Sequence, residues 1–462
     1  MPRTLRNPAG MSWCALMPDA AHARQYLPPG PGTSMADQSA AFTHRPYAFF
    51  DECRAVYGSE FTLRMVGLPP MVVVSDPALV TEVLDTPEVY LGGAGNRATS
   101  VHIALGEHFL LALDGQAHAD LQRRLLGIMA VARAEGMPRV RELTLARVHA
   151  WPIGGRIELA HEMQMLAIDI VLTMLLGHDR HHQRAELARR IHHLVGTSLL
   201  EGEPSMIRSS LAFFPARIPI YELLDVEIAH RQRVGRGNRT DALSMLIEPD
   251  AGAAAGRLSH VQIRDQLLSM TVAGYDTTAT TLAWALHYAL GDAAAMASIR
   301  EDCLQVAGCA QPTPSFLMAR QALTDLVNET ARLQPVSPIV NRMTSRNTRL
   351  GRWQIPKGTM VCPALYLLHR DAIFGPDAHL FRHDRRPARQ REHFMPFGGG
   401  ERRCIGQTFA RPEMNLVLGI ILGGCDLRLL SRESGARRRG FVVIPDSGVP
   451  AVCTARQATI EG

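Results

Sequence analysis

The stretch Phe397-Gly398-Gly399-Gly400-Glu401-Arg402-Arg403-Cys404-Ile405-Gly406 carries most of the information about fold and function in this chain of 462 residues. A cysteine that ligates a metal must be held at a fixed point, kept deprotonated and shielded from water. Glycines allow a tight turn close to a flat cofactor, and a helix beginning after Cys404 would aim free N–H groups at its sulfur. A lone cysteine in a glycine-rich turn is usually a buried structural residue, but this spaced set favours a metal-binding thiolate.

The same stretch resembles the haem-binding signature of the cytochrome P-450 family. The Phe, Gly, Arg, Cys and Gly positions of that signature fall at Phe397, Gly400, Arg402, Cys404 and Gly406. The resemblance implies that Cys404 is the axial ligand of the haem iron and that Phe397, Arg402 and Gly406 also contact the cofactor, with Arg402 on a propionate. Pro412, inside the helix expected after Cys404, departs from regular helix chemistry and predicts a local kink.

The resemblance runs from Pro28 to about Pro450 and implies a mainly α fold with a small β region (α+β), a helix-rich prism enclosing haem b. We expect residues 1–25 to form a flexible N-terminal tail and residues 26–462 to form a single domain. Because no flavin or iron–sulfur segment is fused to the haem domain, the electrons are expected from outside the chain.

The hydrophobic pattern gives the same class of fold. From about 115 to 335 it is mostly helical. Apolar runs beside turn signals predict strands within 59–85 and 338–365, and a closing hairpin near 441–453.

A second motif lies in the long apolar helix predicted over residues 261–290, where the chain reads Ala273-Gly274-Tyr275-Asp276-Thr277-Thr278. The Thr277 hydroxyl can compete for the Ala273 carbonyl, and Gly274 weakens the same turn, which predicts a local opening able to hold water. An acid and an alcohol beside such an opening can relay protons. The motif resembles the family's acid–threonine pair, which implies Asp276 and Thr277 as catalytic residues; alone, it could equally be a buried pair that satisfies helix backbone.

Two further haem contacts follow from the resemblance. Arg342 matches a propionate-binding arginine, and His118, in Asp114-Gly115-Gln116-Ala117-His118, matches another propionate ligand. The family often has an arginine four residues after this histidine, where this chain has Gln122. Arg123 or Arg124 could take over that contact, or the contact could be missing.

Glu329 and Arg332 lie three residues apart on one face of a predicted helix. An exposed pair of this kind would contribute little to stability. The pair resembles the family's Glu-x-x-Arg element, which implies a buried network that braces the cysteine loop. Arg385 matches the third member of that network, in a stretch where His383 replaces the usual proline.

Composition limits the alternatives. The formal net charge of +5 is mild, and no dense basic arm is present, which disfavours a nucleic-acid partner. The eight cysteines are scattered without the spacing of a zinc site or of a small disulfide scaffold, which favours a reducing, cytoplasmic compartment. The most apolar run, Met163 to Gly177, carries Asp169 and is short for a bilayer, so we expect no membrane anchor.

These observations predict a haem-thiolate monooxygenase that inserts one oxygen atom from O2 into a small hydrophobic substrate by hydroxylation or epoxidation. The electrons of NAD(P)H would arrive through a ferredoxin or flavodoxin with its reductase. A haem-thiolate isomerase or peroxygenase on the same fold is a second interpretation, and a non-enzymatic haem-binding sensor is a third. The Asp276–Thr277 pair favours oxygen plus electrons over both.

The resemblance also places substrate-lining segments. They are 101–110, Met270, Ala273, 336–340 and 447–449, with Ser337, Asp446 and Ser447 as polar anchors. The segments are largely apolar, which predicts a hydrophobic substrate with one polar handle.

Overall fold

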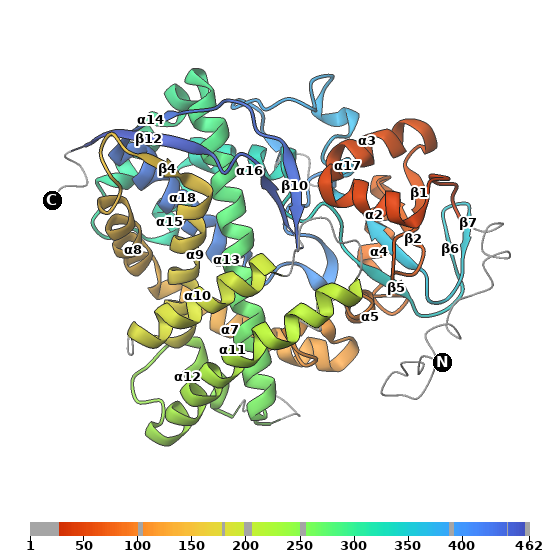
Figure 1. Ribbon diagram of the computed structural model, residues 1–462, viewed down its shortest axis with the longest axis horizontal. Helices are drawn as coiled ribbons and strands as arrows, with labels where there is room; N and C mark the ends of the chain where they lie inside the picture. Colours follow the sequence, from red (N-terminus) through yellow and green to blue (C-terminus); the bar gives the residue numbers. More distant parts are fainter. Residues whose placement is uncertain are drawn as a thin grey trace.

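A computed structural model describes residues 27–99, 105–177, 181–197, 206–249, 256–387, 392–440 and 442–457. The expected N-terminal tail over residues 1–25 lies outside these ranges. Helices dominate the described residues, and the strands form small sheets at one side and along the top of the view in Figure 1.

The helices on the side of the molecule that carries the five-stranded sheet are short. They are α2 (Met35–His44), α3 (Pro46–Tyr57), α4 (Pro77–Asp85), α5 (Gly92–Arg97) and α17 (Leu365–Leu368). The remaining α-helices form the larger helical part. They are α7 (Gly115–Glu135), α8 (Met137–His149), α9 (Leu159–Leu176), α10 (His181–Thr197), α11 (Met206–Val234), α12 (Ala242–Ile247), α13 (His260–Gly291), α14 (Ala293–Ala307), α15 (Pro314–Met318), α16 (Gln321–Leu333) and α18 (Gln407–Gly424). The predicted helical region therefore agrees with the structure.

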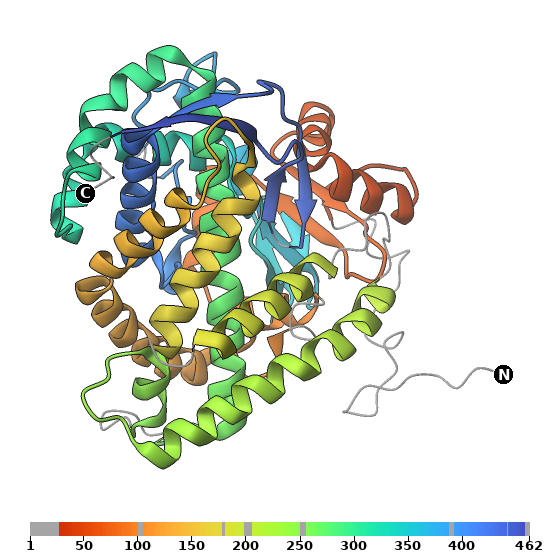
Figure 2. The ribbon, with the colours of Figure 1, turned by 60° about the vertical axis from the view of Figure 1, so that its left-hand side comes forward.

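Helix α13 crosses the centre of the molecule, and α9 lies beside it in both views (Figures 1 and 2). Ser259 caps its first turn by accepting from the Gln262 amide, while the Gln262 side chain accepts from the Ser259 amide. This capping box satisfies two backbone donors that a helix start otherwise leaves free. The largest apolar core of the protein surrounds α13 and includes α9 and α18.

The five-stranded sheet has the order β1-β2-β8-β5-β3 and joins the two predicted strand regions. Its strands are β1 (Glu60–Leu63), β2 (Met71–Val74), β8 (Met360–Pro363), β5 (Arg342–Thr344) and β3 (Tyr90–Leu91). β2 pairs antiparallel with β1 and parallel with β8, so it lies inside the sheet. All four of its residues are buried, which explains the unbroken apolar run at Met71–Val74.

The remaining strands form three smaller sheets. They are β4 (Arg156–Glu158), β12 (Pro450–Arg456) and β9 (Cys425–Leu429) in one sheet, β6 (Thr348–Leu350) and β7 (Trp353–Ile355) in a second, and β10 (Ala436–Arg439) and β11 (Val442–Pro445) in a third.

The prediction of a closing hairpin near 441–453 is wrong, because the strands within this range do not pair with each other. The hairpin consists of β10 and β11, with Arg439 opposite Val442 and a turn at Gly440 (φ 61°). β12 instead pairs with β9 and β4.

Among the described residues, one helix, α9, is long and apolar enough to cross a bilayer by length and composition. About 67% of that window is buried inside the protein, and α9 packs against α13. Burial in the core accounts for the apolar run at Met163 to Gly177.

Glu413 of α18 has a buried carboxyl group, and its Oε1 has no hydrogen-bond partner within the described residues. Burial raises its pKa from 4.5 to about 8. The folded protein therefore binds more protons than the unfolded chain between these values, and stability falls as the pH rises through that window.

We predict that Glu413→Gln removes this loss. At pH 8 the variant should be more stable than the wild type by roughly 2–3 kcal/mol, after discounting the ideal linkage value for relaxation of the site. Urea unfolding at pH 5 and pH 8 measures the effect, with Glu301→Gln on the exposed surface of α14 as the matched control. A gain that is equal at both pH values would contradict a protonated Glu413.

Candidate active site

The cysteine loop is a tight turn that ends at the start of α18. Gly398 (φ 71°) and Gly400 (φ 63°) both adopt the left-handed conformation. A Cβ on Gly400 would collide with the Leu84 carbonyl at the end of α4, so only glycine allows this close approach. The Cys404 amide donates to the Phe397 carbonyl (3.0 Å), which closes the loop.

Cys404 is accessible to solvent, although protein atoms lie around most of its thiol. Burial raises the pKa of its thiol, and hydrogen bonds from the Gly406 and Gln407 amides act in the opposite direction. These two amides lie at the start of α18, as the sequence pattern predicts. The Cys404 sulfur thus accepts from two backbone amides and is also accessible to a metal ion or cofactor.

Three basic side chains from distant segments lie close to one another beside the cysteine loop. They are His118 on α7, Arg342 on β5 and Arg402 in the loop itself. Burial, together with the positive charges of Arg402 and Arg342, lowers the pKa of His118 to about 4, although Asp114 acts in the opposite direction. Burial, followed by the charge of Arg402, lowers the pKa of Arg342 to about 10.

The protein neutralises this basic cluster only partly. Asp114 accepts from Arg402 Nη2 at 2.7 Å. Arg402 Nη1 is buried without a hydrogen-bond partner among the described residues. Arg342 donates to the Asn341 carbonyl (2.9 Å), and no carboxylate in the described part of the chain forms an ion pair with it. A buried excess of positive charge beside an accessible cysteine fits a cofactor that combines a metal with carboxylate groups, so these residues fit haem.

Gln122 stands where the family often has an arginine, and the two arginines that follow it have partners elsewhere. Gln122 donates to the Glu401 carbonyl (2.5 Å) and so ties α7 to the cysteine loop. Arg123 pairs with Asp120 on its own helix, and Arg124 donates to backbone carbonyls at α12. Neither neighbouring arginine therefore takes the place of the family's propionate contact.

Glu329, Arg332 and Arg385 form one buried network. The Glu329 and Arg332 side chains are both fully buried, and two bonds of 2.8 Å join the guanidinium to the carboxylate. Arg385 Nη1 reaches Glu329 Oε1 at 2.5 Å. The pair on α16 is therefore not an exposed surface pair.

This network connects to the cysteine loop through His369. Arg332 Nη1 donates to the His369 carbonyl (2.9 Å), and the His369 ring accepts from the Met395 amide (3.0 Å), two residues before Phe397. Burial lowers the pKa of His369 to about 3, so the ring is neutral and can accept this bond.

The acid–threonine segment lies in the middle of α13. Thr277 Oγ1 donates to the Ala273 carbonyl at 2.6 Å, and Ala273 is exposed although its helix is otherwise largely buried. The α-helix is continuous through Gly274. The hydroxyl thus lies at an accessible patch in the centre of the molecule.

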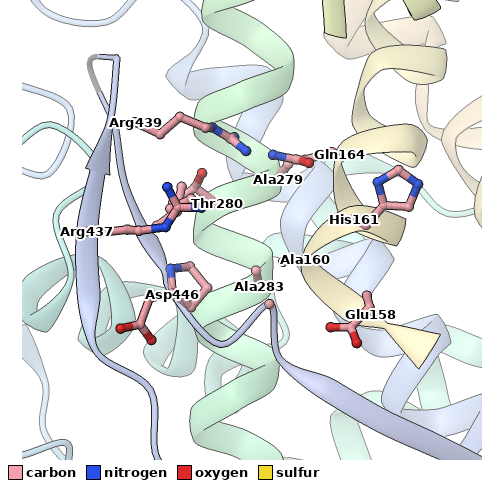
Figure 3. A pocket seen from close by; sticks show the side chains of 13 residues that line it. Glu158, Ala160, His161, Gln164, Ala279, Thr280, Ala283, Arg437, Arg439 and Asp446 are labelled. Atoms are coloured by element: carbon pink, nitrogen blue, oxygen red, sulfur yellow. The ribbon is translucent and has the colours of Figure 1, made fainter. Parts of the chain in front are cut away.

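Asp276 is almost fully buried and forms an ion pair with Arg439, at the end of β10. Burial raises the pKa of Asp276, whereas Arg439 and a hydrogen bond from Gln164 on α9 lower it. The Gln164 amide also bonds to Arg439. Arg439 and Gln164 extend toward each other across the face of α13 (Figure 3).

The sequence interpretation did not include Arg439 or Gln164. The only local signal is the run Arg437-Arg438-Arg439 before a turn glycine, and nothing in it identifies a partner 163 positions away. Of the expected polar substrate anchors, Ser337 donates to Ile339 (2.9 Å), and Ser447 bonds to Ser434 (2.9 Å). Residues 101–104 of the expected substrate loop lie outside the described residues.

Three features together are typical of haem-thiolate enzymes. They are a helix-rich fold, a cysteine whose sulfur accepts from backbone amides at a helix start, and a buried basic cluster beside it. The family model for cytochrome P450 matches residues 28–448. A Mycobacterium tuberculosis protein named cytochrome P450 135B1 is 32% identical to this chain, and the match covers 94% of each of the two chains. Cyclooctatin synthase of Streptomyces melanosporofaciens is 30% identical, covering 90% of this chain and 92% of its own. The crystal structure of the cytochrome P450DA heme domain superposes with a TM-score of 0.80 at 20% identity. The superposition covers 94% of this chain and 98% of that structure.

The chain belongs to the cytochrome P450 family. It is a monooxygenase that uses haem b, molecular oxygen and electrons from redox partners. The predicted fold class and the predicted cofactor are therefore confirmed.

Proposed function

We propose that this monooxygenase inserts one oxygen atom from O2 into a small hydrophobic molecule, by hydroxylation or epoxidation, within secondary metabolism. The substrate-lining side of α13 supports an apolar ligand, since Met270 and Ala273 are both accessible there. A similar protein is named a cyclooctatin synthase, which agrees with a role in making a specialised small molecule. A screen of apolar ligands by haem spectral shift tests the substrate class, and binding restricted to strongly charged molecules would contradict it.

The single observation that carries the proposed site is the cysteine loop beside the basic cluster. Cys404 would hold the iron, with the Gly406 and Gln407 amides tuning its sulfur. His118, Arg342 and Arg402 would hold the propionates, and Phe397 would lie near the sulfur side. When bound, the haem supplies the oxygen-activating chemistry.

Asp276 and Thr277 are proposed to move protons for this reaction. Thr277 presents its hydroxyl at the accessible patch of α13, and Asp276 lies beside it in sequence on the buried side. A carboxyl and a hydroxyl that are held in this way can pass a proton from the protein interior to the reacting side. The pair favours oxygen plus electrons over the isomerase, peroxygenase or sensor interpretations.

We predict that Thr277→Ala keeps haem binding but uncouples the reaction, so that reducing equivalents form hydrogen peroxide. Product formed per NAD(P)H consumed should fall by about tenfold or more, within the usual range for loss of a proton-transfer group. Thr281→Ala is the matched control, because Thr281 Oγ1 makes the same kind of bond one turn later, to the Thr277 carbonyl (2.9 Å). Unchanged coupling in Thr277→Ala would remove this residue from the relay.

A ferredoxin or flavodoxin with its reductase is proposed as the electron donor. Unpaired arginines in the arginine-rich stretch 370–403 would attract an acidic donor protein. Several arginines of this stretch, however, already pair with acidic side chains of the chain itself. Arg382 pairs with Asp377 and Asp384, and Arg386 pairs with Asp325. The exposed Arg403 has no acidic partner in the described chain, and residues 388–391, which include Arg389 and Arg391, lie outside it.

Residues 26–462 are proposed to work as one domain in the cytoplasm. Cys53, Cys303, Cys309, Cys362, Cys404, Cys425 and Cys453 are all free thiols, which suits a reducing compartment. The five-stranded sheet supports one domain, because it joins residues 60–91 to residues 342–363.

A further inference from the structure

A cavity of about 250 Å³, with both polar and apolar side chains in its wall, lies between the start of α9, the middle of α13 and the β10–β11 hairpin (Figure 3). Its lining includes Glu158, His161, Gln164, Thr280 and Arg439. At about 30 Å³ per molecule, such a volume has room for a small group of waters, and these polar side chains offer them hydrogen-bond partners.

Three buried polar atoms at this place have no hydrogen-bond partner among the described residues. They are Asp276 Oδ2, Thr280 Oγ1 and Arg439 Nε. Thr280 and Arg439 line the cavity, and Thr280 lies one helical turn after Asp276, on the same face of α13. Buried polar groups are normally satisfied, so their presence together points to ordered water between them.

Asp276 therefore connects two sides of α13. On one side, the next residue, Thr277, reaches the accessible patch at Ala273. On the other side, Asp276 is bonded by Arg439, which lines the cavity. Because Arg439 already has a carboxylate partner, it is poorly suited to hold an anionic substrate.

We propose that this cavity is the route by which solvent protons reach Asp276, and that Arg439 is the positioning residue that keeps the Asp276 carboxylate at its inner end. This inference rests on the proposed Asp276–Thr277 relay. In each transfer a cavity water gives a proton to the carboxylate, and solvent replaces that proton. Asp276 then gives a proton toward Thr277 and becomes a carboxylate again, while Arg439 stays protonated throughout.

Several titratable groups surround the pair and enter any pH response. Those that line the cavity or interact electrostatically with Asp276 or Arg439 are Tyr275, Glu158, His161, His192, Arg437 and Asp446. Burial raises the pKa of Tyr275 and lowers that of His192, so both stay neutral near pH 7. The charge that acts most directly on Asp276 is Arg439.

Infrared titration of the intact haem-loaded protein tests the pairing independently of turnover. The protonated-carboxyl band that disappears in Asp276→Asn reports Asp276. In Arg439→Met the pH at which this band appears should rise by about one unit or more, because an opposite charge is lost. Arg439→Lys should restore most of the wild-type value, and Arg428→Met, on the exposed surface of β9, should leave it unchanged. An unshifted band in Arg439→Met would overturn the positioning role.

Solvent isotope effects test the route. Ala283→Leu should fill part of the cavity without touching the ion pair, because Ala283 lines it one turn beyond Ala279. We expect a larger solvent isotope effect on turnover and poorer coupling, with the Asp276 band unshifted. Wild-type isotope effects in both Ala283→Leu and Arg439→Met, with Asp276→Asn still slow, would overturn the cavity route and leave the relay standing. If Asp276→Asn and Thr277→Ala are both fully coupled, it is the relay that fails.

Discussion

Arg332→Ala should yield little soluble, haem-loaded protein. Removing the guanidinium leaves the Glu329 carboxylate fully buried without its main partner. It also removes donors to the His369, Ala378 and Leu380 carbonyls. Breaking a buried ion pair costs roughly 3–5 kcal/mol, which is a large part of a typical total stability of about 5–15 kcal/mol.

The measurement is the haem content and urea midpoint of purified Arg332→Ala. Arg382→Ala is the matched control, because Arg382 lies nearby and pairs with two aspartates while half exposed. Exposed pairs contribute about 0–1 kcal/mol, so the control should remain loaded and stable. Normal loading and stability of Arg332→Ala would mean that the network does not brace the cysteine loop.

The parts of the site that were predictable from sequence depend on local spacing. The turn at Gly398 and Gly400, the helix after Cys404 and the bond from Thr277 to Ala273 each involve residues within a few positions of one another. Backbone sterics and helix periodicity therefore determine them directly.

The parts that were missed depend on tertiary packing. The strand β10 reads Ala-Arg-Arg-Arg, which has little of the β-branched or aromatic character of a typical strand, so the hairpin was placed too late in the chain. Its pairing with the apolar β11 carries Arg439 to Asp276. No periodic pattern encodes that contact, which arises only when the hairpin packs against α13.

Cys404→Ser should abolish oxygenation altogether. A serine hydroxyl stays protonated near neutral pH. Hydrogen bonds from the two amides that lower the pKa of the thiol are too weak to ionise an alcohol. A haem held by Cys404 would rely on the electron density of this thiolate for oxygen activation, and the serine variant would not supply it. Cys309→Ser, at a partly exposed thiol outside the site, is the control and should keep full activity.

The most direct test of a cysteine-ligated haem is the spectrum of the reduced protein with carbon monoxide. The wild type and Cys309→Ser should show the red-shifted Soret band of a thiolate-ligated haem, and Cys404→Ser should lack it. A wild-type spectrum of the ordinary histidine-ligated kind, or a red-shifted band that survives in Cys404→Ser, would contradict Cys404 as the ligand.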